Sequence, residues 1–170
     1  MTLDQLNNLP KQAFTDVLAG IFEHSPWVPE RAWPQRPFAS VDALHAAMCA
    51  VVADASVDEQ MALIRAHPQL AGKAAVRGEL TAASASEQSG AGLGQCSQEE
   101  FARITALNDA YQDSFGFPFI LAVRGHSRQS IIANMDRRLT HAREVEVVEA
   151  LHQIERIAGF RLADIIAAGC

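Results

Sequence analysis

The sequence predicts an all-α protein with a single domain over residues 1–170, about eight helices and one extended segment near 117–123. Apolar residues recur every three or four positions along most of the chain, whereas the alternation typical of strands is nearly absent. Capping residues precede several of these periodic segments, and Gly or Pro follows them. A chain of this length can bury one substantial core. The expected helices differ too much in length for a simple up-down bundle.

The helices can be assigned in chain order. A first helix is expected over 10–20, and Ser40 is a suitable N-cap for a helix over 41–55. The next helix, Val57–Ala66, ends before Pro68 because proline disfavours helical geometry at the preceding residue. Two weaker helices are expected over 71–80 and 83–90. Another begins after a capping box of Ser97 and Glu100. The last two are expected from Ser127 or Ser130 to Leu139 and over Arg143–Ala167.

Composition narrows the class of protein. A formal net charge of -6 argues against a general nucleic-acid surface, which needs clustered Lys and Arg. No apolar run is long enough to span a membrane, and the N-terminus does not resemble a signal peptide. The three cysteines, Cys49, Cys96 and Cys170, form no CxxC pair, so a reducing cytoplasm is expected. The histidines show no metal-binding spacing such as HExxH, and no metal site is expected.

The pair His67-Pro68 is the first candidate for chemistry. A histidine at a helix end can face a cleft, and its ordinary pKa allows proton exchange near neutral pH. The alternative is a surface or capping histidine.

Ser84, Glu87 and Gln88 form a second candidate group, just before a glycine-rich turn. Glu87 could take part in proton transfer or fix the tautomer of a histidine. The alternative is structural, because Ser84 and Glu87 also have the spacing of a capping box.

The remaining candidates are the segment 117–123 and Arg161. Extended backbone has N–H and C=O groups that need partners, which a polar ring ligand or a packed protein interior could supply. Arg161 falls on the apolar stripe of the last helix and is expected to point inward, where a guanidinium needs an anion. That anion could be an internal carboxylate or a group of a substrate. Arg124 is a weaker candidate of the same kind.

Four blocks of the sequence together resemble the OHCU decarboxylase family, named for 2-oxo-4-hydroxy-4-carboxy-5-ureidoimidazoline. They are HPQLAGK from His67, SASEQ from Ser84 with a later Gly-Leu, LNDAYQDSFGFPF from Leu107 with a later VRG, and IERIAGFRLAD from Ile154. Each block alone is weak evidence. Their shared order and separation along the whole chain make the resemblance specific.

The resemblance implies a carboxy-lyase that converts OHCU to (S)-allantoin and CO2, the last step from urate to allantoin. It also implies a cytoplasmic homodimer whose ligand is a small ureide, with no nucleic acid, membrane or cofactor involved. The implied catalytic residues are His67 and Glu87, and the implied substrate-binding residues are Pro68, Ser84, Gln88, Phe119, Ile120, Leu121, Ala122, Val123 and Arg161.

Two other functions stay open at this stage. The chain could be a helical binding module without catalysis, in which case Arg161 would form an internal ion pair. It could also be an enzyme that acts on another ureide intermediate, such as 5-hydroxyisourate. Assays with the separate intermediates distinguish these functions.

Overall fold

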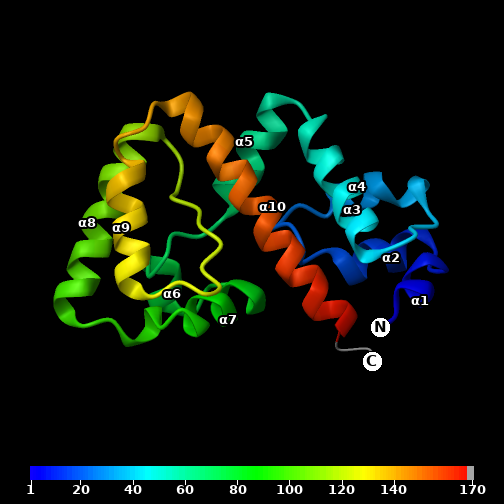
Figure 1. Ribbon diagram of the computed structural model, residues 1–170, viewed down its shortest axis with the longest axis horizontal. Coiled ribbons are helices and arrows are strands. Elements are labelled where there is room, and N and C mark those ends of the chain that lie inside the picture. The colour runs from blue at the N-terminus through cyan, green and yellow to red at the C-terminus, as the bar shows by residue number, and fades with distance from the viewer. Residues whose placement is uncertain (168–170) are drawn as a thin grey trace. The chain divides into compact units, whose positions relative to one another are not determined.

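The computed structural model describes residues 1–167, and over this range it is all-α and contains no strand, as predicted (Figure 1). Cys170 lies outside the described residues. The α-helices are α1 (Leu3–Asn7), α2 (Lys11–Leu18), α3 (Trp27–Ala32), α4 (Val41–Ala53), α5 (Val57–Ala66), α6 (Lys73–Arg77), α7 (Ala82–Gly90), α8 (Gln98–Phe115), α9 (Arg128–Arg138) and α10 (Arg143–Ala167), with two short 3-10 helices, η1 (Trp33–Gln35) and η2 (Leu93–Gln95).

The chain folds into two compact units. Unit 1 consists of residues 1–66 together with the chain from Glu155 onward, and unit 2 consists of residues 67–154. Helix α10 contributes to both units. All candidate site residues lie in unit 2 except Arg161, which belongs to unit 1.

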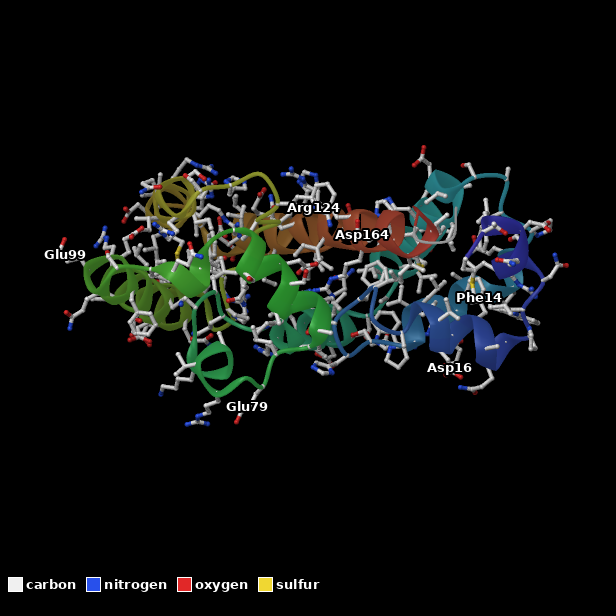
Figure 2. All side chains as sticks on the ribbon, turned by 90° about the horizontal axis from the view of Figure 1, so that it is seen from below. Phe14, Asp16, Glu79, Glu99, Arg124 and Asp164 are labelled. Carbon is white, nitrogen blue, oxygen red and sulfur yellow. The ribbon has the colours of Figure 1, made fainter. Side chains whose placement is uncertain are left out.

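Unit 1 is built on a core from α2, α3 and α4. Phe14, Leu44 and Met48 are fully buried there, whereas Asp16 of α2, which is labelled with Phe14 in Figure 2, is exposed. The predicted N-cap is confirmed, since Ser40 Oγ accepts a hydrogen bond from the backbone N–H of Ala43 at 3.0 Å. Helices α1 and α3 were not predicted, because five or six residues are too few to show a helical period.

Unit 2 is built around α8. The predicted capping box is present: Ser97 Oγ accepts from the Glu100 N–H, and Glu100 Oε1 accepts from the Ser97 N–H, both at 3.1 Å. Helix α8 ends at Gly116, whose φ of 78° favours glycine. The residues of its apolar stripe from Ile104 to Phe115 are buried, whereas Phe101 is 40% exposed.

Helix α10 has the predicted bounds, but the part of it in unit 2 is not buried along a wholly apolar face. The apolar residues Val147 and Leu151 are only half-buried. The polar residues Glu146 and Gln153 are buried in their place, at 0% and 4% exposure. Both have hydrogen-bond partners inside the unit, which makes their burial possible. None of the described helices has the length and apolar character needed to cross a membrane.

The chain between α8 and α9 has no regular secondary structure over residues 117–123, as predicted (Figure 1). All five residues from Phe119 to Val123 are buried. The segment is therefore a buried connection, which is one of the two possibilities that the sequence left open. Its backbone groups require partners within unit 2.

Candidate active site

His67 follows directly after the last residue of α5, at the start of a short loop. Its side chain is only 7% exposed, which contradicts the alternative of a surface histidine. Pro68 beside it is half-buried. A buried imidazole at a helix end is protected from bulk water while its loop sets its direction.

Side chains from α7 and α8 hold the loop that follows His67. Gln88 Oε1 accepts a hydrogen bond from the Ala71 N–H at 2.9 Å, and Gln88 Nε2 donates to the Gln69 carbonyl at 3.3 Å. Asn108 Nδ2 donates to the Leu70 carbonyl at 2.9 Å. Three consecutive residues of the loop are thus fixed by two amide side chains, both of which are buried.

The same loop has an unusual backbone conformation. Ala71 has a φ of 48°, in the left-handed region that costs a residue with a Cβ about 1–2 kcal/mol. A Cβ placed on the next residue, Gly72, would lie 2.8 Å from Cβ of Gln69, so the turn requires glycine there. Such strain persists where surrounding contacts enforce it, and it is frequent at functional sites. Here the contacts are those of Gln88 and Asn108.

Ser84, Glu87 and Gln88 lie on one face of α7, since residues three and four apart share a helix face. Ser84 and Gln88 are buried, and Glu87 is half-buried. The capping alternative for Ser84 and Glu87 is wrong, because α7 begins earlier and Thr81 Oγ1 caps it by accepting from the Ser84 N–H at 3.3 Å. Gln88 thus connects the face that carries Ser84 and Glu87 to the His67 loop.

We expect the substitution Gln88→Leu to lower both stability and turnover. It leaves the buried Ala71 N–H without its acceptor, which costs about 1–3 kcal/mol. The loop after His67 is then less well fixed, so turnover should fall together with the urea midpoint. Gln98→Leu, the same change at an exposed position on α8, is the matched control. Equal stability and turnover of the two variants would show that the hydrogen bonds between Gln88 and the loop have no role.

Two buried side chains hold the main chain of the segment 117–123. Arg138 Nη1, from the end of α9, donates to the Ile120 carbonyl at 2.6 Å. Gln153 Oε1, from α10, accepts from the Ala122 N–H at 3.0 Å. The segment is therefore a packed connection with specific anchors, whether or not it also binds a ligand.

Arg138 belongs to a buried polar network that was not predicted from the sequence. Arg138 and Glu146 are both fully buried, and Arg138 Nη2 lies 2.8 Å from Glu146 Oε2. The Tyr111 hydroxyl donates to the same carboxylate, and His141 Nδ1 lies 2.8 Å from its other oxygen. A signal for Arg138 was available, since it continues the buried stripe of Ile131 and Met135 at helical spacing.

The pKa values of the network follow from these contacts. Burial alone would raise the pKa of Glu146, but hydrogen bonds from Arg138 and Tyr111 and the charge of Arg138 outweigh it and lower this pKa. Burial and the hydrogen bond to Glu146 raise the pKa of Tyr111. Glu146 is therefore an anion and Tyr111 a neutral donor at neutral pH.

Arg161 is buried in unit 1, as its place on the apolar stripe predicted. Its Nη1 donates to Glu23 Oε2 at 2.8 Å and to the Gly20 carbonyl at 3.0 Å. The internal carboxylate that the sequence analysis allowed is therefore present. Binding of a substrate group by Arg161 stays a prediction.

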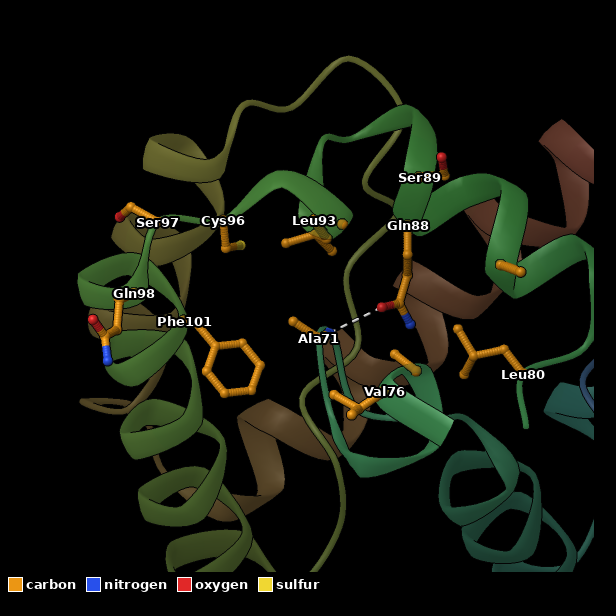
Figure 3. A pocket seen from close by; sticks show the side chains of 13 residues that line it. Ala71, Val76, Leu80, Gln88, Ser89, Leu93, Cys96, Ser97, Gln98 and Phe101 are labelled. Carbon is orange, nitrogen blue, oxygen red and sulfur yellow. Dashed lines mark hydrogen bonds between the residues drawn. The ribbon is translucent and has the colours of Figure 1, made fainter. Parts of the chain in front are cut away.

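Unit 2 also contains a largely apolar cavity of about 650 Å³ (Figure 3). The cavity is lined by Gln88 and Ala71, so it adjoins the loop that follows His67. It is not lined by His67, Ser84 or Glu87. Cys96 borders it as well, but burial and the nearby Glu100 raise the pKa of this thiol, which disfavours the nucleophilic thiolate. Among residues 1–167, no group of three or more His, Cys, Asp or Glu side chains could hold a metal ion.

Comparison with known proteins gives a consistent result along the chain. The family model described as OHCU decarboxylase matches residues 7–163. The chain is 43% identical over 164 residues to the 2-oxo-4-hydroxy-4-carboxy-5-ureidoimidazoline decarboxylase of Haloferax volcanii, with 96% of this chain and 95% of that protein covered. It is 46% identical over 165 residues to the uric acid degradation bifunctional protein PucL of Bacillus subtilis, covering 97% of this chain and 33% of that protein.

A solved structure shows the same relationship. The crystal structure of an (S)-allantoin synthase superposes with a TM-score of 0.77 at 31% identity. The match covers 98% of this chain and 54% of that one. The chain thus spans a third of the Bacillus protein and about half of the synthase, but nearly all of the Haloferax decarboxylase.

Proposed function

The chain belongs to the OHCU decarboxylase family, and from this premise we propose that it converts OHCU to (S)-allantoin and CO2. The structural observation that supports the proposal most is the buried His67 on a loop that Gln88 and Asn108 fix in place. Such a loop holds one acid/base group in one direction, which delivery of a proton to a single face of a substrate requires.

The chemistry needs no external electron acceptor. The carbon of OHCU that bears the carboxylate also bears a hydroxyl and adjoins a ring C=N. When its bond to CO2 breaks, the electron pair moves toward this imine, so the substrate is its own electron sink. The imine nitrogen takes up a proton, the hydroxyl loses its proton as it becomes the ring carbonyl, and one proton is added to the carbon that carries the ureido group. We therefore propose catalysis without a cofactor or metal.

His67 is the proposed acid/base that delivers this proton. Glu87, in the same unit, orients His67 or the substrate hydroxyl. Ser84 and Gln88 hydrogen-bond the ring and ureido groups, and Gln88 has a second Nε2–H besides the one it gives to Gln69. Pro68 restricts the loop beside His67.

The main chain of Phe119 to Val123 is the proposed grip for the planar ring. A cyclic ureide presents N–H and C=O groups along its edge, which backbone C=O and N–H groups match. The burial of the whole segment supports the proposal, because hydrogen bonds of a ligand are stronger where water is excluded.

Arg161 is the proposed partner of an anionic or carbonyl group of the substrate, and we expect Arg161→Met to raise KM. A charge-assisted hydrogen bond contributes about 1.5–3 kcal/mol, so KM should rise about 10- to 100-fold. Glu23→Gln is the control, since it removes the charge of the internal partner and keeps the guanidinium. If Arg161→Met keeps the wild-type KM but has a lower melting temperature, Arg161 does not bind substrate and has only the structural role of its ion pair with Glu23.

A cytoplasmic homodimer completes the proposal. Light scattering on the purified protein distinguishes a dimer from a single chain of 18.4 kDa. The dimer proposal predicts twice that mass at micromolar concentration, and a mass of one chain would contradict it.

Separate supply of two ureides tests the choice of substrate. We expect the protein to consume OHCU with release of CO2 and to leave the decay of 5-hydroxyisourate unchanged. Consumption of 5-hydroxyisourate alone would indicate a different enzyme of the pathway. No effect on either compound would indicate a helical binding module.

A further inference from the structure

We propose that Arg138 is a positioning residue of this site, which fixes the segment 119–123 so that its remaining main-chain groups are preset for the substrate ring. The inference rests on the proposed function, because that function assigns the ring to this segment.

Two main-chain groups of the segment are already bound within unit 2. Arg138 donates to the Ile120 carbonyl, and Gln153 accepts from the Ala122 N–H. The N–H and C=O of Leu121, which lies between these two residues, are the main-chain groups assigned to the ring edge.

The guanidinium of Arg138 is itself held in place by its neighbours. Its Nε and Nη2 donate to Glu146 Oε2 at 3.0 and 2.8 Å, which leaves Nη1 directed at Ile120. Its guanidinium also lies 4.4 Å from the centre of the Phe119 ring. Glu146 is held in turn by Tyr111 and His141. Arg138 therefore contacts the segment at two successive residues and cannot turn away without breaking its ion pair.

The buried ion pair of Arg138 and Glu146 supplies something that an apolar pair would not. Removing two charges from water is costly, and well-packed apolar residues often replace such a pair without loss of stability. An apolar pair cannot donate a hydrogen bond to the Ile120 carbonyl. The property that only the charged pair supplies is thus the anchoring of the segment.

A double substitution, Arg138→Met with Glu146→Leu, separates anchoring from stability because it leaves neither charge buried alone. We expect KM for OHCU to rise about tenfold or more, the effect of one well-made hydrogen bond on affinity, with kcat within a few-fold. Hydrogen exchange of the 117–125 peptide should become faster. The exposed pair of Arg103 and Asp136, changed to Met and Leu, is the matched control and should alter neither quantity.

A second variant guards against misfolding of the first. Gln153→Leu removes the acceptor of the Ala122 N–H without touching a buried charge, and it should raise KM in the same way. The proposal is overturned if either folded variant keeps the wild-type KM and exchange rate, with turnover falling only in proportion to the folded fraction. Failure of the proposed function is a separate result: wild-type protein would then not accelerate OHCU decay, while the exchange rates would still report the anchoring.

Discussion

Replacement of His67 by Asn lowers kcat for OHCU by about a hundred- to ten-thousand-fold, the usual contribution of a general acid/base. Asparagine is similar in size and still forms hydrogen bonds, but it cannot exchange a proton near neutral pH. KM should stay within a few-fold of the wild-type value, because the proposed grip on the ring comes from other residues. Steady-state kinetics with freshly generated OHCU measure both constants.

His152→Asn is the matched control for this prediction. His152 is exposed on α10, and the same chemical change there should leave kcat and KM unaltered. If His67→Asn keeps kcat within a few-fold of wild type, His67 does not transfer the proton. If kcat falls only because the folded fraction falls, the role of His67 is structural.

The single substitution Arg138→Met should lower the free energy of unfolding by about 3–5 kcal/mol. It removes one partner of a fully buried ion pair and leaves the buried Glu146 carboxylate with only Tyr111 and His141 as side-chain partners. That loss is a large share of the 5–15 kcal/mol that stabilises a typical domain. Urea unfolding monitored by far-UV circular dichroism measures it.

The stability that Arg138→Met loses should depend on pH, because the substitution changes the pKa of Glu146. In the folded wild type the pKa of Glu146 is lowered, so its stabilising contribution is present above the ordinary pKa of about 4.3 and is lost as pH falls. Without Arg138, burial instead raises this pKa, and protonation relieves the buried charge. The deficit of the variant should therefore shrink as pH falls from 7 toward 4. A deficit independent of pH would show that lost packing, not the buried charge, causes it.

Much of the fold follows from local signals in the sequence. The capping box of Ser97 and Glu100, the N-cap at Ser40 and the bounds of α10 were all predicted, because capping and periodicity act within a few residues. Helices α1 and α3 were missed since short helices depend on tertiary packing. Helix α7 begins within one residue of its predicted start, but the alternative of a cap at Ser84 was wrong because Thr81 and Ser84 are both good caps, and the structure uses Thr81.

The site could be predicted only in part. The burial of Arg161 was correct because its place on an apolar stripe is a local property. The same argument applied to α9 would have found Arg138, but its partners Glu146 and Ile120 depend on how α9, α10 and the segment pack. The left-handed Ala71 had no signal at all, since alanine gives no indication of positive φ and its partner Gln88 is distant in sequence.

The most direct test of the decarboxylase assignment is the chirality of the allantoin that the protein forms. OHCU decays spontaneously to racemic allantoin, so its rate of disappearance alone does not decide. Circular dichroism in an allantoin band, after OHCU is generated in situ from urate, separates the two cases. The assignment predicts a rapid rise of the (S)-enantiomer signal with folded protein. A slow, optically silent decay that the protein does not change would contradict it.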